Sequence, residues 1–329
     1  MGTYLERYAE PAAEARRAMV RLIAAEGALT DPAWRAAFEE VPRHLFVPYY
    51  FTGGPGGHER LWCEDPDPVR RERWLRGAYY DGPLATRIRD GELISSSSQP
   101  SLMARMLQAL QVRYGDAVLE IGAGTGYNAA LLCHRLGEER ITTVDMEPEI
   151  TESARAHLAA AGYRPAVVTG DGARGCPERA PFDRIIATCA LPFVPYDWAA
   201  QCRPDARILA PLSTGLIALR VRDDARHGRI AEGRFLRTSA YFVPLRGSGP
   251  AAERRPGALP RRVLENDLFR FMLSLTGRSL DPREALSLWE RERRPLRDRF
   301  GVTVVGGRQW AWLDDPEGPY VWPLGRRDG

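Results

Sequence analysis

A glycine-rich turn between a short apolar run and an amphipathic stretch constrains the fold of this chain more than any other feature. It lies within residues 118–127, which read VLEIGAGTGY, with glycines at Gly122, Gly124 and Gly126. Glycine suits a backbone that bends sharply, and it lets a ligand approach the chain without meeting a Cβ atom. The order of strand, glycine turn and helix therefore predicts a ligand site at the end of a parallel strand.

Short apolar runs and helix-like patterns alternate on both sides of this turn. Strands that alternate with helices imply a parallel sheet covered on both faces. Residues 95–225 are thus expected to form a doubly wound, Rossmann-like α/β fold. The predicted strands are 117–121, 141–144, 166–168, 184–187, 207–212 and 217–221, and the predicted helices between them are 102–110, 128–136 and 150–161.

The segments outside this core have other patterns. Residues 4–40 show helical spacing of apolar side chains, whereas residues 52–92 are loop-rich. The tail combines a helical stripe with a β-hairpin whose turn is Gly306-Gly307. The predicted organisation is an N-terminal helical and loop region over 1–94, the core domain over 95–245, a linker over 246–262 and a small C-terminal α+β appendage over 263–329.

The composition excludes several function classes. Hydrophobic residues make up 44% and charged residues 27% of the chain, as in ordinary globular proteins. The formal net charge of +3 is too balanced to indicate a nucleic-acid partner. All 46 basic residues are Arg, so the chain has no Lys for catalysis or for a Schiff base.

Cysteine and histidine usage bears on metals and on location. The five cysteines form no C-x-x-C pair, and the five histidines show no ligand spacing. We therefore expect no metal and no disulfide framework, and a reducing cytoplasm is the predicted location. The sequence also shows no run apolar enough to cross a membrane and no hydrophobic signal core near its start, so no membrane partner is expected.

The spacing of the glycines distinguishes between two classes of cofactor. A dinucleotide site normally reads G-x-G-x-x-G, with pyrophosphate at the helix N-terminus. Here the spacing is G-x-G-x-G, and Glu120 precedes the first glycine. S-adenosylmethionine (SAM) has no phosphate but carries an ammonium group that an acid can attract. The motif therefore favours SAM over a nicotinamide dinucleotide.

Two further acids follow predicted strands at the expected intervals. Asp145, followed by Met146, ends the second strand, where a carboxylate can accept hydrogen bonds from both ribose hydroxyls. Asp171, followed by Gly172, lies in a turn after the third strand, where it can accept from an adenine amino group. Each feature alone is also typical of a tight turn or a solvated acid. Their occurrence together in this order favours a SAM site.

At three segments the chain resembles the protein-L-isoaspartate O-methyltransferase family. They are residues 41–48 (VPRHLFVP), residues 122–127 (GAGTGY) and residues 181–188 (PFDRIIAT). The resemblance implies a SAM-dependent methyltransferase fold and methylation of the free carboxylate of isoaspartyl residues, whose ester then collapses to a succinimide. A carboxylate is already ionised at neutral pH, so the absence of an obvious general base suits this reaction.

The same resemblance assigns a role to a run of serines ahead of the first core helix. The family places the acceptor with a short Ser-containing segment, which corresponds here to residues 94–101, ISSSSQPS. Ser98 occupies the register of the family's substrate-binding serine, and the hydroxyls of Ser96 and Ser97 are further candidates to hold the acceptor carboxylate. The alternative interpretation is a polar turn that caps the helix beginning near Pro100.

The chain departs from the usual repair enzymes of this family at two points. Ser101 stands where they have a histidine, and about a hundred residues follow the core sheet. Both features resemble a subgroup that acts in the maturation of ribosomally made peptides such as lanthipeptides and graspetides. In that subgroup a macrocyclic peptide presents an aspartate, whose ester forms an aspartimide that persists or hydrolyses to isoaspartate.

Four functions therefore remain as hypotheses. The serine run and the tail favour carboxyl methylation of an aspartate in a macrocyclic peptide, and this is the function we expect. The core motifs alone favour the alternative, which is general isoaspartyl repair. A SAM-fold protein that only binds and presents a peptide would be revealed by failure to bind SAM. A nicotinamide oxidoreductase is disfavoured by the glycine spacing and by Glu120.

Overall fold

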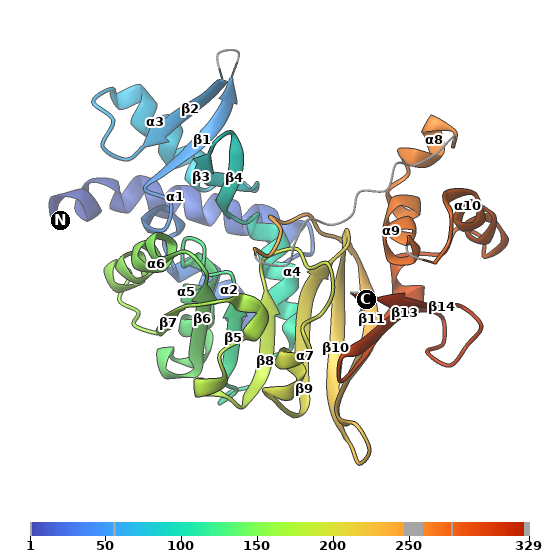
Figure 1. Cartoon of the computed structure of the whole chain (residues 1–329). Coiled ribbons are helices and arrows are strands. Elements are labelled where there is room, and N and C mark those ends of the chain that lie inside the picture. The colour runs from blue at the N-terminus through green and yellow to red at the C-terminus, as the bar shows by residue number, and fades with distance from the viewer. Residues whose placement is uncertain (1, 55–56, 247–258, 278, 326–329) are drawn as a thin grey trace. The chain divides into compact units, whose positions relative to one another are not determined.

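The computed structural model describes residues 2–54, 57–246, 259–277 and 279–325. The chain divides into two compact units, Met1–Gly170 and Asp171–Gly329, and each is described by itself (Figure 1). Most of the predicted linker, residues 247–258, lies outside the described residues. The domain boundaries expected from the sequence therefore remain predictions.

Four helices and a 3₁₀ turn precede the parallel strands in the described part of the first unit. Asp31 and Asp67 cap α2 and α3, because their carboxylates accept hydrogen bonds from backbone N–H groups of the first turn. Proline follows at the first position of both helices, where its missing N–H is not needed. The elements are α1 (Gly2–Ala25), α2 (Pro32–Glu40), η1 (Arg43–Leu45), α3 (Pro68–Ala78) and α4 (Pro100–Leu110).

The segment predicted to be loop-rich contains a four-stranded antiparallel sheet, so that prediction was wrong. Its strand order is β2-β1-β3-β4, formed by β1 (Tyr49–Gly54), β2 (Gly57–Trp62), β3 (Leu84–Arg89) and β4 (Glu92–Ser97). The turn between β3 and β4 is Asp90-Gly91, with φ of 53° and 80°. Positive φ at both positions is the geometry that favours an Asp-Gly hairpin turn.

The rest of the first unit is the parallel βαβ region that the sequence predicted. Strands β5 (Val118–Ile121), β6 (Ile141–Asp145) and β7 (Ala166–Thr169) pair in parallel, and all four side chains of β5 are buried. Helices α5 (Tyr127–Leu136) and α6 (Pro148–Ala160) connect them, together with the short turn η2 (Glu138–Arg140). The carboxyl ends of β5 and β6 lie side by side, where ligands bind in such sheets.

The second unit is built around a seven-strand run in the order β14-β13-β12-β11-β10-β9-β8. β8 pairs with β9 in parallel, and the remaining neighbours are antiparallel. The strands are β8 (Phe182–Ala187), β9 (Cys202–Leu212), β10 (Gly215–Asp224), β11 (Gly228–Ser239), β12 (Phe300–Val305), β13 (Arg308–Leu313) and β14 (Val321–Leu324). The predicted hairpin around Gly306-Gly307 is the β12–β13 pair.

Strand β11 was missed by the sequence analysis. Arg and Glu side chains fill many of its positions, and only a minority of its residues are buried. It connects the two halves of the second unit, because it pairs with β10 on one side and with β12 on the other. The helical elements of this unit are η3 (Gly172–Arg174), η4 (Pro177–Arg179), α7 (Tyr196–Ala200), α8 (Arg261–Leu264), α9 (Asp267–Thr276), α10 (Pro282–Arg291) and η5 (Arg297–Arg299).

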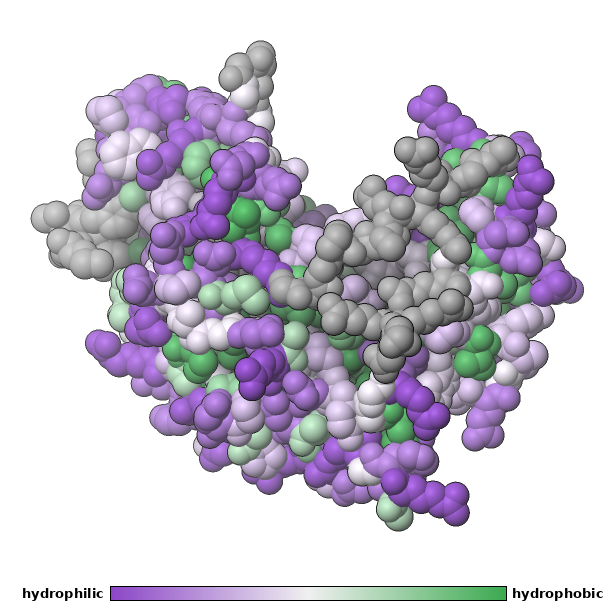
Figure 2. All heavy atoms as spheres, viewed as in Figure 1, coloured by the Kyte–Doolittle hydropathy of each residue, from purple (hydrophilic) through white to green (hydrophobic). Residues whose placement is uncertain are grey.

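The outer surface is predominantly polar. Figure 2 shows hydrophilic side chains over most of the visible face, with apolar side chains scattered among them. Large apolar side chains that are well exposed, such as Tyr114 and Tyr80, are few among the described residues. Within those residues, no helix combines the length and the apolar character that crossing a membrane requires.

Candidate active site

The glycine loop between β5 and α5 has the backbone that only glycine adopts readily. Gly122, Gly124 and Gly126 have φ of 96°, 51° and 87°. A Cβ atom at Gly126 would lie 3.2 Å from Cγ of Leu158 and 3.3 Å from the carbonyl oxygen of Ala154. The tight turn therefore serves two purposes, since it reverses the chain and lets α6 pack closely against the loop.

Asp145 lies beside this loop. Its Oδ2 atom accepts a hydrogen bond from the Gly124 N–H at 3.2 Å, and its Oδ1 atom accepts from the Glu147 N–H at 3.5 Å. The side chain is half-buried, as is that of Met146. The structure thus brings the predicted ribose acceptor and the glycine loop together at one edge of the sheet. The roles of Asp145 and Met146 toward a cofactor stay predictions.

Glu120 is fully buried beneath the loop. Oε1 accepts from Asn128 Nδ2 at 2.7 Å, and Oε2 accepts from Thr143 Oγ1 at 2.6 Å. Burial raises the pKa of Glu120 to about 7, although the two hydrogen bonds favour the ionised form. Glu120 thereby connects β5, β6 and the start of α5, and both of its oxygens are engaged within the protein.

Asp171 and Gly172 begin the second unit. The Asp171 carboxylate accepts from the Ala173 N–H at 2.9 Å and so caps η3, while the Gly172 carbonyl accepts from Trp198 Nε1 at 2.8 Å. These contacts fix the turn that carries Asp171. Its predicted role at an adenine amino group stays a prediction, as does that of Gly172.

The serine segment runs along β4 and against the glycine loop. A Cβ atom at Gly124 would lie 3.4 Å from the Ser96 carbonyl oxygen and 4.0 Å from Ser95 Oγ. Ser97 is buried, whereas Ser96 and Ser98 are half-buried. Two motifs that the sequence singled out separately are therefore neighbours in space, although the structure does not test their role toward the acceptor.

A buried arginine holds the end of this segment. Arg43 is inaccessible to solvent, and its guanidinium lies 5.9 Å from the centre of the Tyr127 ring. Burial lowers the pKa of Arg43 to about 10, so the side chain still carries its charge at neutral pH. Its donors reach the carbonyl oxygens of Ala78, Tyr80, Gly82, Ser97 and Ser98 at 3.0 to 3.5 Å, and also Ser97 Oγ at 3.3 Å.

Asp81 holds the other side of the same turn. Its Oδ1 atom accepts from the Ser101 N–H at 2.8 Å, and its Oδ2 atom accepts from Gln99 Nε2 at 3.1 Å. The Asp81 carboxylate therefore satisfies a backbone N–H in the first turn of α4. The N-cap residue of α4, Gln99, makes no such side-chain hydrogen bond. Asp81 and Arg43 together fix the backbone between β4 and α4.

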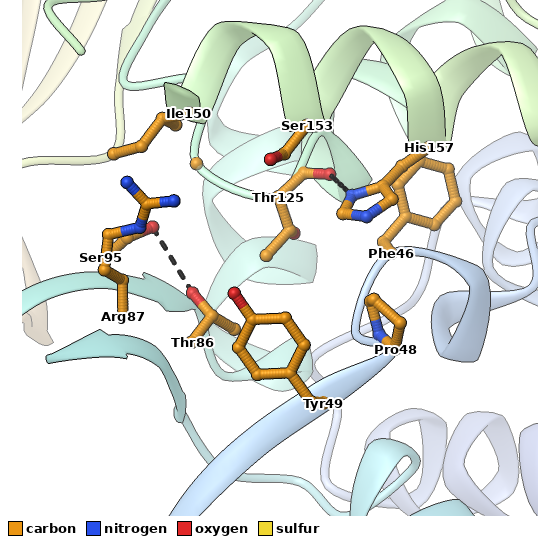
Figure 3. A pocket seen from close by; sticks show the side chains of 11 residues that line it. Phe46, Pro48, Tyr49, Thr86, Arg87, Ser95, Thr125, Ile150, Ser153 and His157 are labelled. Atoms are coloured by element: carbon orange, nitrogen blue, oxygen red, sulfur yellow. Dashed lines mark hydrogen bonds between the residues drawn. The ribbon is translucent and has the colours of Figure 1, made fainter. Parts of the chain in front are cut away.

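A pocket opens next to the contact between β4 and the glycine loop. Figure 3 shows side chains from β1, β3, β4 and α6 around it. Within it, Thr86 Oγ1 donates to Ser95 Oγ at 3.3 Å. The lining residues are Phe46, Pro48, Tyr49, Thr86, Arg87, Ser95, Gly124, Thr125, Ile150, Ser153 and His157.

His157 orients the loop from the far side of the pocket. Its Nδ1 atom lies 3.0 Å from the Thr125 carbonyl oxygen, which can only accept, so Nδ1 carries the proton (Figure 3). Burial lowers the pKa of His157 below its usual value, and its imidazole is therefore neutral at pH 7. We assign it a structural role at the loop.

Of the residues predicted for the site, only Gly124 lines this pocket. Tyr49, Thr86 and Arg87 were not predicted, because the strands that carry them were not recognised. Ser95 lies in the predicted acceptor segment, residues 94–101, but was not named among its candidate hydroxyls. The Asp90-Gly91 dipeptide between two short β-prone runs is the signal that would have indicated the β3–β4 hairpin. Among the described residues, no group of three or more His, Cys, Asp or Glu side chains could hold a metal ion.

Comparisons with known proteins relate this chain to one enzyme family. The profile of the family described as Protein-L-isoaspartate(D-aspartate) O-methyltransferase (PCMT) matches residues 67–248. A protein-L-isoaspartate O-methyltransferase of Aeropyrum pernix is 36% identical over 245 residues, which cover 73% of this chain and 83% of the relative. One of Methylorubrum extorquens is 36% identical over 242 residues, covering 73% and 92%.

Solved structures show the same fold. A protein-L-isoaspartate O-methyltransferase structure aligns with a TM-score of 0.62 at 21% identity, covering 95% of this chain and 100% of its own. A beta-aspartate methyltransferase from Plasmodium falciparum, in complex with S-adenosyl-L-homocysteine, aligns with a TM-score of 0.50 at 12% identity, covering 70% and 97%. At these identities the likeness concerns the fold, and it confirms the Rossmann-like methyltransferase fold predicted from the sequence.

Proposed function

The chain belongs to the protein-L-isoaspartate(D-aspartate) O-methyltransferase family, and we propose on this basis that it methylates the free carboxylate of isoaspartyl residues in a peptide or protein, with SAM as the methyl donor. The observation that carries this proposal is the packing of β4 against the glycine loop, where the Ser96 carbonyl oxygen would lie 3.4 Å from a Cβ atom at Gly124. The serine segment (residues 94–101), which we propose holds the acceptor, is thus adjacent to the glycine loop, which we propose holds the cofactor.

The residues around the loop fit SAM. Three glycines with positive φ leave the backbone of the turn free of side chains, and the Asp145 carboxylate lies beside it. Within the described part of the chain, Asn128 Oδ1 is buried without a hydrogen-bond partner, as expected of an acceptor that a bound ligand satisfies. The loop and Asp145 would hold SAM, which supplies a methyl group on an activated sulfonium.

The protein's part in such a reaction is to place the acceptor and exclude water. A side-chain carboxylate is ionised at neutral pH, so no group has to remove a proton from it. Arg43 and Asp81 hold the backbone of residues 97–101 at both ends and so keep the Cα atom that carries the Ser98 side chain in one place. Holding reactants in a fixed geometry is itself a large source of rate acceleration.

The test is methyl transfer from labelled SAM to two short peptides that differ only in carrying isoaspartate or aspartate. We expect labelling of the isoaspartyl peptide, and base-labile release of the label as methanol, because the product is an ester. The control is binding of SAM, measured by calorimetry before the transfer assay. Labelling of neither peptide by a protein that binds SAM would contradict the proposal.

A second candidate function is methylation of an aspartate in a macrocyclic, ribosomally made peptide. It is favoured by the serine at position 101, which is buried in the first turn of α4. The tail gives less support, since a solved protein-L-isoaspartate O-methyltransferase structure aligns with 95% of this chain and hence shares the fold of most residues after 245. Labelling of a constrained aspartyl peptide, without labelling of linear isoaspartyl peptides, would favour this candidate.

A further inference from the structure

The pocket between the β3–β4 hairpin and α6 has the lining of an anion site. None of its eleven described lining residues is acidic, and Arg87 contributes a permanent positive charge. His157 adds no charge at neutral pH, because burial lowers its pKa. Four aliphatic hydroxyls and the Tyr49 phenol complete the polar part, and Figure 3 shows the Tyr49 hydroxyl directed into the pocket.

The hydroxyl of Ser95 is prepared to donate. It accepts a hydrogen bond from Thr86 Oγ1 at 3.3 Å, and a serine hydroxyl that accepts one bond keeps its own proton for another acceptor. The same oxygen lies 4.0 Å from the position of a Cβ atom at Gly124, so it is adjacent to the glycine loop. The Ser95 hydroxyl, which can donate, and the Arg87 guanidinium therefore both line the pocket where the serine segment meets the glycine loop.

Glu149 at present neutralises Arg87. The two side chains form an ion pair, in which Arg87 is 24% exposed and Glu149 is 67% exposed. Glu149 lies largely in solvent, which weakens its ion pair, and a carboxylate in the first turn of α6 is favoured there without a partner. Another carboxylate can thus replace Glu149 at Arg87 at little cost.

We propose that this pocket is a carboxylate-binding subsite, in which Arg87 and Ser95 bind the carboxylate of a reactant. In the absence of that reactant, Glu149 forms the ion pair with Arg87. The proposal rests on the proposed function, which brings two carboxylates to this place. One is the side-chain carboxylate of the acceptor peptide, and the other is the α-carboxylate in the methionine part of SAM. A guanidinium suits either, because its planar donors match both oxygens of a carboxylate.

The test compares Arg87→Met with Arg89→Met. Arg89 lies two residues further along β3, pairs with Glu147 at 3.4 Å and does not line the pocket, so its variant is a matched control for charge and for strand position. Calorimetry measures the binding of SAM, and then the binding of an isoaspartyl peptide to the complex with S-adenosylhomocysteine. Thermal unfolding checks that both variants fold.

If the subsite holds the SAM carboxylate, Arg87→Met weakens SAM binding by about tenfold or more, as expected for loss of a charge-assisted hydrogen bond. Decarboxylated SAM then binds equally to the variant and the unaltered protein. If the subsite holds the acceptor, SAM binding is unchanged and peptide binding weakens by a similar factor. In either case Glu149→Gln strengthens the affected binding, because it removes the competing carboxylate.

Identical binding of both ligands by Arg87→Met and Arg89→Met overturns the subsite. Failure of the proposed function gives a different result, namely absence of methyl transfer by the unaltered protein. Because the binding measurements do not depend on turnover, they test in that case as well whether the pocket binds a carboxylate.

Discussion

At the scale of single residues, the glycine loop depends on Gly126 in two ways: its backbone has a positive φ, and α6 packs closely against it. Gly126 has φ of 87°, and a Cβ atom there would contact Leu158 and the Ala154 carbonyl at 3.2 and 3.3 Å. We expect Gly126→Ala to destabilise the protein by about 2–3 kcal/mol, the sum of a left-handed alanine and a forced contact.

Gly27→Ala is the matched control for this prediction. Gly27 has φ of 70°, but a Cβ atom there meets nothing within 4 Å. Its substitution should therefore cost only the conformational part, about 1 kcal/mol. Urea unfolding of both variants measures the difference, and equal losses would show that packing against α6 does not constrain the loop.

The buried Glu120 makes stability depend on pH. Burial raises its pKa to about 7 from the ordinary value of 4.5, so the folded protein binds this proton more tightly than the unfolded chain does. Its contribution to stability is full below pH 4.5 and is lost as pH rises toward 7. The loss amounts to about 3 kcal/mol over this window.

The measurement is urea unfolding of the unaltered protein and of Glu120→Gln at several values of pH between 4.5 and 8. Glutamine resembles the protonated acid and does not titrate, so the variant should gain stability relative to the unaltered protein as pH rises through this window. A difference that stays constant with pH would show that Glu120 does not titrate there.

Asp145 gives a further test of the cofactor site. Its carboxylate lies beside the loop and accepts from the Gly124 N–H. We expect Asp145→Ala to weaken SAM binding by about 1–3 kcal/mol, because ribose hydroxyls would lose their acceptor. Glu152→Ala on the exposed face of α6 is the charge control, and unchanged affinity in Asp145→Ala would remove Asp145 from the site.

At the scale of elements, the hydrophobic periodicity of the sequence predicts the strands and helices of the parallel core, but it does not predict the strands of the N-terminal sheet. Strands β5 and β6 and helix α5 begin and end within one residue of their predicted limits, because each is buried and has a clear apolar pattern. Strand β2, in contrast, has a single buried position, and its Glu59 pairs with Arg70 and Arg73 of α3. Partners distant in sequence stabilise such strands, so local pattern does not reveal them.

The candidate site could be predicted only in part for the same reason. The glycine loop and Asp145 follow strands that the sequence identifies, and they could be placed at one sheet edge by the rule for parallel strands. Arg87 and Ser95 reach the pocket only because the Asp90-Gly91 turn folds β3 and β4 together. Their position follows from tertiary packing, which a single sequence does not display.

Within the β4–α4 connection, we expect Ser98→Ala to lower turnover and leave SAM binding nearly unchanged. Arg43 holds Ser98 through its carbonyl oxygen, so alanine keeps the backbone in place and removes only the hydroxyl. Loss of a hydrogen bond to a charged acceptor corresponds to roughly a tenfold or larger decrease in rate. Steady-state kinetics and calorimetry on the same preparation separate the two effects.

Ser97→Ala provides the comparison for that variant. The Ser97 hydroxyl accepts from Arg43 inside the protein, so its removal should reduce stability more than turnover. Equal loss of turnover and of SAM affinity in Ser98→Ala would show that Ser98 acts on the cofactor loop and not on the acceptor.

At the scale of the whole molecule, the C-terminal residues complete the core of the second unit. β12 pairs with β11 over five positions from Ile230↔Val305 to Arg234↔Gly301. Phe271 of α9 packs edge-on against Phe235 of β11, with ring centres 4.8 Å apart. These contacts join the tail to β11, which lies within the residues that match the family profile.

We therefore predict that a chain ending at residue 245 does not reach a stable folded state. The edge of β11 and the side chain of Phe235, which is 2% exposed in the full chain, would lose their cover, and such edges promote association between chains. Sedimentation and thermal unfolding of the shortened and full chains measure this. A shortened chain that is monomeric, unfolds at the same temperature and binds SAM would show that the tail is an independent appendage.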